Sequence, residues 1–156
     1  MQVRRYGGSP ETGQSYRDRP GCYAMVVRGG EALLTIEHGQ DRSEVQLPGG
    51  GVDPGEPFLA ALHREVMEET GWRIGPARLA GIYQSYRYMP QYGFHARKVH
   101  RIYVARAVAR LSEPLEAHHD AFWAPFDISP DLISNRTDAE YLRANFGRIA
   151  GLALAT

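Results

Sequence analysis

Three glutamates, Glu65, Glu68 and Glu69, have the types and spacing that most clearly suggest chemistry. They lie in a segment with apolar residues at helical spacing, so positions i, i+3 and i+4 share one face of the predicted helix. Carboxylates about 5–6 Å apart on a helix repel by about 0.2–0.5 kcal/mol per pair. A divalent cation would remove this repulsion, and hard oxygen ligands suit Mg²⁺ or Mn²⁺ better than zinc. The alternative is a solvated acidic stripe without a metal.

A run of three glycines, Gly49, Gly50 and Gly51, follows a Leu-Pro pair and precedes this helix. Glycine has no Cβ atom, so such a run adopts backbone conformations that other residues avoid and allows another group to approach closely. We therefore expect some other group to lie against the backbone of residues 47–51.

The spacing of these features is specific. Gly50 is followed after five residues by Glu56, and after a further seven by residues 64–72, which read REVMEETGW. Seven fixed residue types at fixed offsets coincide by chance on the order of once in 10⁹ starting positions at average composition. The pattern resembles the Nudix box, with Trp72 standing where an aliphatic residue is usual.

This resemblance implies both a fold and a reaction. The fold is an α/β/α sandwich around a mixed β-sheet. The reaction is the metal-assisted hydrolysis of a nucleoside diphosphate linked to another moiety. The resemblance also implies that the loop containing Gly50 and Gly51 lets the metal and the diphosphate approach the backbone.

The resemblance also assigns roles to individual residues. It implies metal ligands at Glu65, Glu68, Glu69 and the carbonyl group of Gly49. Glu56 is expected to support the site rather than to bind metal, and Arg64 to hold carboxylates in position. Arg64 lies four residues before Glu68, a spacing at which two side chains on a helix can meet.

The residue that activates water is expected either in the box or in the later segment 113–123. Glu116 and Asp120 flank two histidines there, so either acid could be the general base or an extra metal ligand. The alternative is a surface loop with solvated charges. In that case a box glutamate, Glu69 or Glu65, would activate the water.

A basic stretch is the third feature that suggests binding. Residues 72–110 contain eight Arg and Lys residues and no Asp or Glu. Arg87, Arg97 and Lys98 lie nearest the turn-rich residues 89–93, and we expect them to contact phosphate or base. Solvated strand faces are the alternative reading, and the interleaved tyrosines leave open a role in the core or in a homodimer.

The elements that must position these residues follow from local patterns. Residues 1–19 form a polar N-terminal arm, and 20–156 a single domain. A glycine-rich turn at 29–31 joins two strands, and Gly71 ends the helix that Asp53 or Glu56 can cap. A short helix begins at Ser129-Pro130, and Asp138 is expected to cap the last one. The predicted strands are 22–28, 32–37, 45–47, 74–88, 99–108 and 121–125, and the predicted longer helices are 57–70 and 139–149.

Composition limits the partners. Eighteen basic and eighteen acidic residues give zero net charge, so binding of a polyanion must be local, and we expect a small nucleotide rather than DNA or long RNA. The single cysteine suggests a reducing compartment, and without a signal peptide or membrane span we expect the cytoplasm. The alternative function is a module that binds a nucleotide or nucleotide sugar without hydrolysis, against which the complete set of box glutamates argues.

Overall fold

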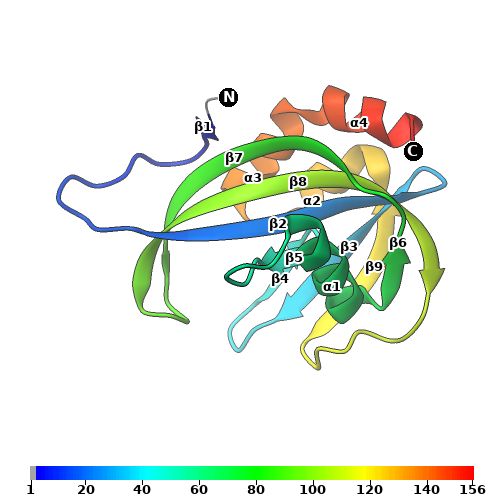
Figure 1. Ribbon diagram of the computed structural model, residues 1–156, viewed down its shortest axis with the longest axis horizontal. Coiled ribbons are helices and arrows are strands. Elements are labelled where there is room, and N and C mark those ends of the chain that lie inside the picture. Colours follow the sequence, from blue (N-terminus) through cyan, green and yellow to red (C-terminus); the bar gives the residue numbers. More distant parts are fainter. Residues whose placement is uncertain (1–2) are drawn as a thin grey trace.

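The computed structural model describes residues 3–156 and consists of a mixed β-sheet with helices on both faces (Figure 1). The main strand order is β1-β7-β8-β2-β3-β4, while β5 pairs with β2, β6 with β8 and β9 with β3. The predicted α/β/α sandwich around a mixed sheet is therefore confirmed. The strands are β1 (Arg4–Arg5), β2 (Arg17–Arg28), β3 (Glu31–His38), β4 (Ser43–Gln46), β5 (Gly49–Gly51), β6 (Trp72–Ile74), β7 (Arg78–Met89), β8 (Phe94–Arg110) and β9 (His119–Pro125).

Helix α1 (Phe58–Thr70) covers one face of the sheet. The other face carries a short 3₁₀ turn, η1 (Phe126–Ile128), followed by α2 (Ser129–Leu132), α3 (Arg136–Ala144) and α4 (Phe146–Leu154). Two separate apolar clusters fill these layers, because successive side chains of a strand point to opposite faces. Leu62 and Val66 belong to the cluster under α1, and Tyr141 and Ile149 to the cluster under α3 and α4.

The central strands β2 and β8 run parallel from Arg17, opposite Ala96, to Val27, opposite Arg106. The turn between β2 and β3 consists of Gly29 and Gly30, which both have positive φ angles, of 52° and 80°. Positive φ at both turn residues suits a tight hairpin, and this predicted hairpin is confirmed.

Helix α1 ends as predicted but does not begin as predicted. Gly71 has a φ of 74°, and its N–H group donates to the carbonyl of Met67. The expectation that Asp53 or Glu56 caps the N-terminus is wrong, because the N-cap residue is Pro57 and no side chain caps it. Both carboxylates face Arg64 instead, which competes for them with its positive charge.

Part of the predicted N-terminal arm is built into the fold. Arg4 and Arg5 pair with β7, and the ring of Tyr6 packs edge-on against Tyr83 and Tyr141, with centroids 5.7 and 5.2 Å away. The arm therefore covers buried aromatic residues. Residues 1–2 of the predicted arm lie outside the described residues.

The C-terminal helices also differ from the expectation. Asn135, not Asp138, caps α3, since its side chain accepts a hydrogen bond from the Asp138 N–H group. The predicted single helix is divided at Asn145 into α3 and α4. Within residues 3–156, no helix has the length and apolar character that crossing a membrane requires.

Candidate active site

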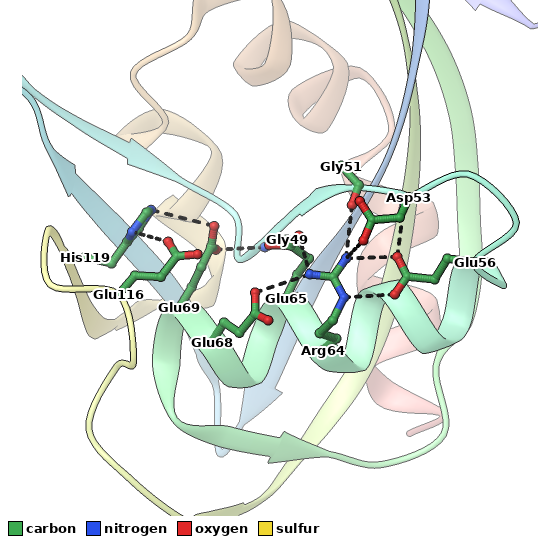
Figure 2. A network of polar contacts seen from close by, with 10 residues as sticks. All are labelled: Gly49, Gly51, Asp53, Glu56, Arg64, Glu65, Glu68, Glu69, Glu116 and His119. Carbon is green, nitrogen blue, oxygen red and sulfur yellow. Dashed lines mark hydrogen bonds and ion pairs between the residues drawn. The ribbon is translucent and has the colours of Figure 1, made fainter. Parts of the chain in front are cut away.

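Arg64 lies at the centre of the acidic face of α1 (Figure 2). Its Nη1 atom donates to Glu65 Oε1 at 2.8 Å and to Glu68 Oε2 at 3.2 Å. The expected contact between Arg64 and Glu68 is therefore present. Its Nη2 atom also donates to the carbonyl of Gly51 at 3.3 Å, which ties the helix to the glycine loop.

Glu56 holds the other side of the same guanidinium group. Arg64 Nε and Nη2 donate to the two Glu56 oxygens at 2.8 and 2.9 Å, a two-pronged contact that charge-assisted pairs favour. The hydrogen bonds from Arg64 lower the pKa of Glu56 to about 2. Glu56 is thus an ionised partner of Arg64, in agreement with a supporting position.

Glu69 is the most enclosed of the three glutamates, with 11% of its side chain exposed. Burial raises its pKa to about 9, although the N–H group of Gly49 donates to Glu69 Oε2 at 3.0 Å and opposes the rise. Gly49 has a φ of 145°, and a Cβ atom there would collide with the carbonyl of Cys22. Only glycine can therefore bring this N–H group to the carboxylate.

Glu65 lies beneath the next residue of the loop. A Cβ atom on Gly50 would come within 2.6 Å of the Glu65 carboxyl carbon, so a side chain there would push the carboxylate away from Arg64. Burial also raises the pKa of Glu65 above its ordinary value, despite the hydrogen bond from Arg64. The close approach expected at the glycine run is thus made by glutamates of the helix.

The segment before β9 adds two further groups to this face. His119 is buried, and its Nδ1 atom lies 2.7 Å from Glu116 Oε2. Its Nε2 atom lies 3.6 Å from Glu69 Oε1, so the imidazole lies beside both carboxylates (Figure 2). The backbone N–H groups of Leu115 and Glu116 donate to the carbonyl of Glu68, which fixes this segment against the end of α1.

These groups fit a divalent cation by their chemistry. One ligand atom each of Glu65, Glu68 and Glu116 lie within 4.8 Å of one another, and the same holds for Glu69, Glu116 and His119. The donors are mainly carboxylate oxygens, which Mg²⁺ and Mn²⁺ prefer. Burial is the main cause of the raised pKa values of Glu65 and Glu69, and neighbouring carboxylates add to it.

Asp120, the second acid of the segment, lies elsewhere. Its Oδ2 atom is 2.7 Å from His38 Nε2, and 71% of its side chain is exposed. Glu116 and Asp120 were equivalent by sequence, but only Glu116 joins the glutamate clusters. His119 was not singled out by the sequence. Its place in the cluster depends on the pairing of β9 with β3, in which it lies opposite Glu37.

A cleft of about 770 Å³ opens beside strands β3 and β4. Its walls are the β3–β4 loop and the β7–β8 turn, and its lining includes Arg87, Lys98 and Asn135. Arg87 Nη2 is held by Asp138 Oδ1 at 3.0 Å and by Ser85 Oγ at 2.8 Å. Lys98 Nζ contacts the Tyr23 hydroxyl group at 3.2 Å.

Arg97 does not share this cleft. It is the strand neighbour of Lys98 and therefore points to the opposite face of the sheet. Its Nε and Nη2 atoms both donate to the Asp18 carboxylate at 2.7 Å. The structure brings together two of the three basic residues that the sequence grouped.

Comparisons with known proteins agree with this architecture. The family model described as NUDIX domain matches residues 16–144. The NAD-capped RNA hydrolase NudC of Pseudomonas syringae pv. syringae (strain B728a) is 33% identical over 127 residues, which cover 81% of this chain and 43% of that protein. The putative 8-oxo-dGTP diphosphatase of Bacillus subtilis (strain 168) is 36% identical over 64 residues, 41% of this chain and 42% of that protein.

A solved structure resembles the whole fold. The MutT NUDIX hydrolase from Burkholderia pseudomallei has a TM-score of 0.62 and 28% identity, over 80% of this chain and 97% of that chain. The chain therefore belongs to the Nudix family. It matches less than half of the length of the two curated relatives.

Proposed function

We propose that this protein hydrolyses the phosphoanhydride bond of a nucleoside diphosphate derivative or a nucleoside triphosphate with Mg²⁺ or Mn²⁺. The observation that carries the proposal is the cluster of four carboxylates, Glu65, Glu68, Glu69 and Glu116, which form two overlapping groups that share Glu116. Arg64 contacts Glu65 and Glu68 of this cluster. Such a cluster is unfavourable by itself and becomes favourable when it binds cations.

Each residue of the cluster has its own proposed role. Glu65, Glu68 and Glu69 would hold the metal together with the Gly49 carbonyl, and Arg64 keeps two of these carboxylates in place through direct hydrogen bonds. When bound, the ion would neutralise phosphate charge and lower the pKa of the attacking water. Gly50 and Gly51 carry no side chain that would keep a diphosphate away from the loop.

Glu116 is the proposed general base. It lies at the edge of the cluster, where about a third of its side chain is exposed and can meet a water molecule. His119 lies within 4.0 Å of both Glu116 and Glu69, so it links the base to a proposed metal ligand. A base must reach the attacking water directly or through one other water.

Substrate binding is assigned to the cleft between the β3–β4 loop and the β7–β8 turn. Arg87 and Lys98 line it and supply positive charge for phosphate, while Asn135 supplies amide groups for a base or sugar. The names of the relatives suggest two classes of substrate, a free nucleotide such as 8-oxo-dGTP and the 5′ end of an RNA. Arg97, paired with Asp18, is the weakest of the substrate contacts proposed from sequence.

Location and partners remain proposals of the same kind. Cys22 is buried and free, which suits a reducing compartment and supports the cytoplasm. A small nucleotide is the proposed substrate, and a homodimer stays a prediction from the aromatic strands.

A panel assay tests the function. The protein is incubated separately with a nucleoside triphosphate, 8-oxo-dGTP, a nucleotide sugar and NAD⁺. Each incubation contains Mg²⁺, Mn²⁺ or EDTA, and phosphate release is measured in a coupled assay. We expect release from at least one substrate with metal and none with EDTA. Tight binding of a nucleotide without release under any condition would instead identify a binding module.

A further inference from the structure

Two histidines and a glutamate form a further group of possible metal ligands outside helix α1. One ligand atom each of Glu37, His118 and His119 lie within 4.8 Å of one another. Glu37 is half-buried and His118 is exposed, so a dissolved ion can reach these side chains from solvent. We call these three residues the histidine group.

The pairing of β3 with β9 brings the histidine group together. Glu37 in β3 lies directly opposite His119 in β9. The N–H group of His38 donates to the carbonyl of His118 at 2.8 Å, which holds the preceding residue against the end of β3. The rings of His118 and His119 have centroids 4.7 Å apart and planes tilted by 46°. Backbone hydrogen bonds of the sheet therefore fix the positions from which all three side chains extend.

The donors of the histidine group differ from those of the cluster of four carboxylates. The histidine group offers two imidazole nitrogens and one carboxylate oxygen. Imidazole suits Zn²⁺ and similar transition-metal ions, whereas a set of oxygen ligands suits Mg²⁺. Two histidines and one glutamate are a ligand set that zinc sites use, with the fourth position left to water or substrate. The donor set therefore favours a zinc-like ion.

The surroundings of His119 fit a metal ligand. Its side chain is only 6% exposed, and its Nδ1 atom lies 2.7 Å from Glu116 Oε2 (Figure 2). Among residues 3–156 this nitrogen has no hydrogen-bond partner, so the contact with Glu116 lacks the alignment of a hydrogen bond. An unsatisfied buried polar group costs about 1–3 kcal/mol. A histidine that binds metal through one nitrogen usually donates the other ring N–H to a carboxylate, and Glu116 stands where Nδ1 needs this acceptor.

Glu37 is supported from its own side. Gln46 Nε2 donates to Glu37 Oε2 at 2.9 Å, and ligating carboxylates are commonly held by such a hydrogen bond. Glu37 and Gln46 both line the cleft proposed for substrate. His119 Nε2 lies 3.6 Å from Glu69 Oε1, so the histidine group also borders the cluster of four carboxylates. The group therefore lies between the proposed metal ligands and the cleft.

We propose that Glu37, His118 and His119 bind a zinc-like divalent ion at a site separate from the proposed Mg²⁺ site. His119 binds through Nε2 while its Nδ1 faces Glu116, and Glu37 supplies a carboxylate oxygen. The ion adds positive charge to the end of the cleft that borders the carboxylates. Binding of this ion requires no hydrolysis, so the inference goes beyond the proposed function and does not rest on it.

Calorimetric titration of the full chain with Zn²⁺ in excess Mg²⁺ tests the site. Excess Mg²⁺ competes for the carboxylate cluster but poorly for imidazole. We expect one Zn²⁺ ion to bind under these conditions. His118→Gln and Glu37→Gln should each weaken Zn²⁺ binding at least about tenfold, because each variant lacks one ligand. Neither side chain is fully buried, so the melting temperature in EDTA should stay near that of the parent.

Matched controls separate the histidine group from the carboxylate cluster. His63→Gln removes an exposed histidine of α1 and should leave the Zn²⁺ affinity unchanged. Glu68→Gln removes a carboxylate of the cluster and should also leave it unchanged. Failure of Zn²⁺ to bind in excess Mg²⁺, or parental affinity in His118→Gln or Glu37→Gln, would overturn the site. An equal loss of affinity in Glu68→Gln would overturn it too, by placing the ion in the carboxylate cluster.

The two proposals can fail separately. If the parent hydrolyses no anhydride yet binds Zn²⁺ through His118 and Glu37, the proposed function is wrong and the zinc site stands. If the parent hydrolyses a nucleotide with Mg²⁺ and both variants bind Zn²⁺ as the parent does, only the zinc site is wrong.

Discussion

Two charged networks lie on opposite faces of the same sheet, and they differ in the number of carboxylates for each positive charge. On the α1 face, Arg64 contacts three glutamates, while Glu69 and Glu116 both lie beside His119. On the other face, Asp138 accepts from the Tyr83 hydroxyl at 2.6 Å and from Arg87 at 3.0 Å. The first network has more carboxylates than cations, and the second is matched.

The pKa values express this difference. Burial would raise the pKa of Asp138, but Arg87, His100 and the Tyr83 hydroxyl together lower it below its ordinary value. Burial raises the pKa of Glu69 to about 9, because no guanidinium group contacts it. A network with equal numbers of carboxylates and cations stabilises the fold, whereas a network with excess carboxylates is stabilised when it binds a cation. Functional sites are where such perturbed groups collect.

The largest expected effect is on catalysis by Glu68. Glu68→Gln keeps an oxygen for Arg64 but removes a negative charge from the proposed metal site. We expect kcat to fall about 10³-fold, equivalent to about 4 kcal/mol, because a metal ion contributes several kcal/mol to the transition state. Steady-state kinetics at saturating Mg²⁺ measures this loss.

The fold of this variant should survive. Removing a charge from a crowded face relieves repulsion, so the melting temperature should stay the same or rise. Glu113→Gln is the matched control, since within residues 3–156 this exposed glutamate forms an ion pair only with Arg110, and its loss should leave kcat unchanged. Near-parental kcat in Glu68→Gln would contradict the assignment of the cluster.

The matched network should show the opposite behaviour, with a loss of stability. Asp138→Ala leaves Arg87 and the Tyr83 hydroxyl partly buried without their acceptor. We expect the free energy of unfolding to fall by about 3 kcal/mol, the lower end for a broken buried ion pair, because a quarter of each charged side chain is exposed. Urea denaturation measures the change.

An exposed ion pair provides the comparison. Asp131 lies 2.7 Å from Arg143, and both side chains are more than half exposed. Asp131→Ala should cost less than about 1 kcal/mol. Equal losses in the two variants would show that the matched network contributes no more than a surface pair.

Glu116 and Asp120 test which acid belongs to the unmatched network. Glu116→Gln should lower kcat about 100-fold and remove the acidic limb of the pH profile, as expected for a general base. Asp120→Asn should change kcat by less than about twofold, since Asp120 faces His38 at the surface. A raised metal requirement in Glu116→Gln, with the acidic limb intact, would make Glu116 a ligand instead.

The sequence predicted the parts of the fold that depend on local pattern. The glycine turn at Gly29-Gly30, helix α1 and its end at Gly71 follow from turn chemistry and apolar spacing, and the structure has all three. The caps were wrong because Glu56 and Asp138 have stronger partners, Arg64 and Arg87, that are distant in sequence. A local pattern contains no information about such competition.

The site follows the same division. The face shared by Glu65, Glu68 and Glu69 is local and was predictable from helical spacing. The choice between Glu116 and Asp120, and the presence of His119, depend on how β9 pairs with β3. The separation of Arg97 from Lys98 follows from strand alternation. That Arg97 is paired with an acid could not be predicted, because Asp18 reaches it only through the pairing of β2 with β8.

The last prediction concerns pH and the stability of the metal-free protein. The ordinary pKa of a glutamate is 4.5, and burial raises that of Glu69 to about 9 in the folded protein. Between these values the folded state keeps a proton that the unfolded state has released, so stability falls as pH rises, by at most about 1.4 kcal/mol per pH unit. Urea denaturation in EDTA from pH 5 to pH 9 should show this decline. Glu69→Gln should flatten it, leaving the smaller contribution of Glu65, whose pKa is also raised. Because a cation favours the ionised carboxylate, Mg²⁺ should restore more stability at pH 8 than at pH 5. An unchanged slope in Glu69→Gln would show that folding does not raise the pKa of Glu69, and the contrast between the two networks would then disappear.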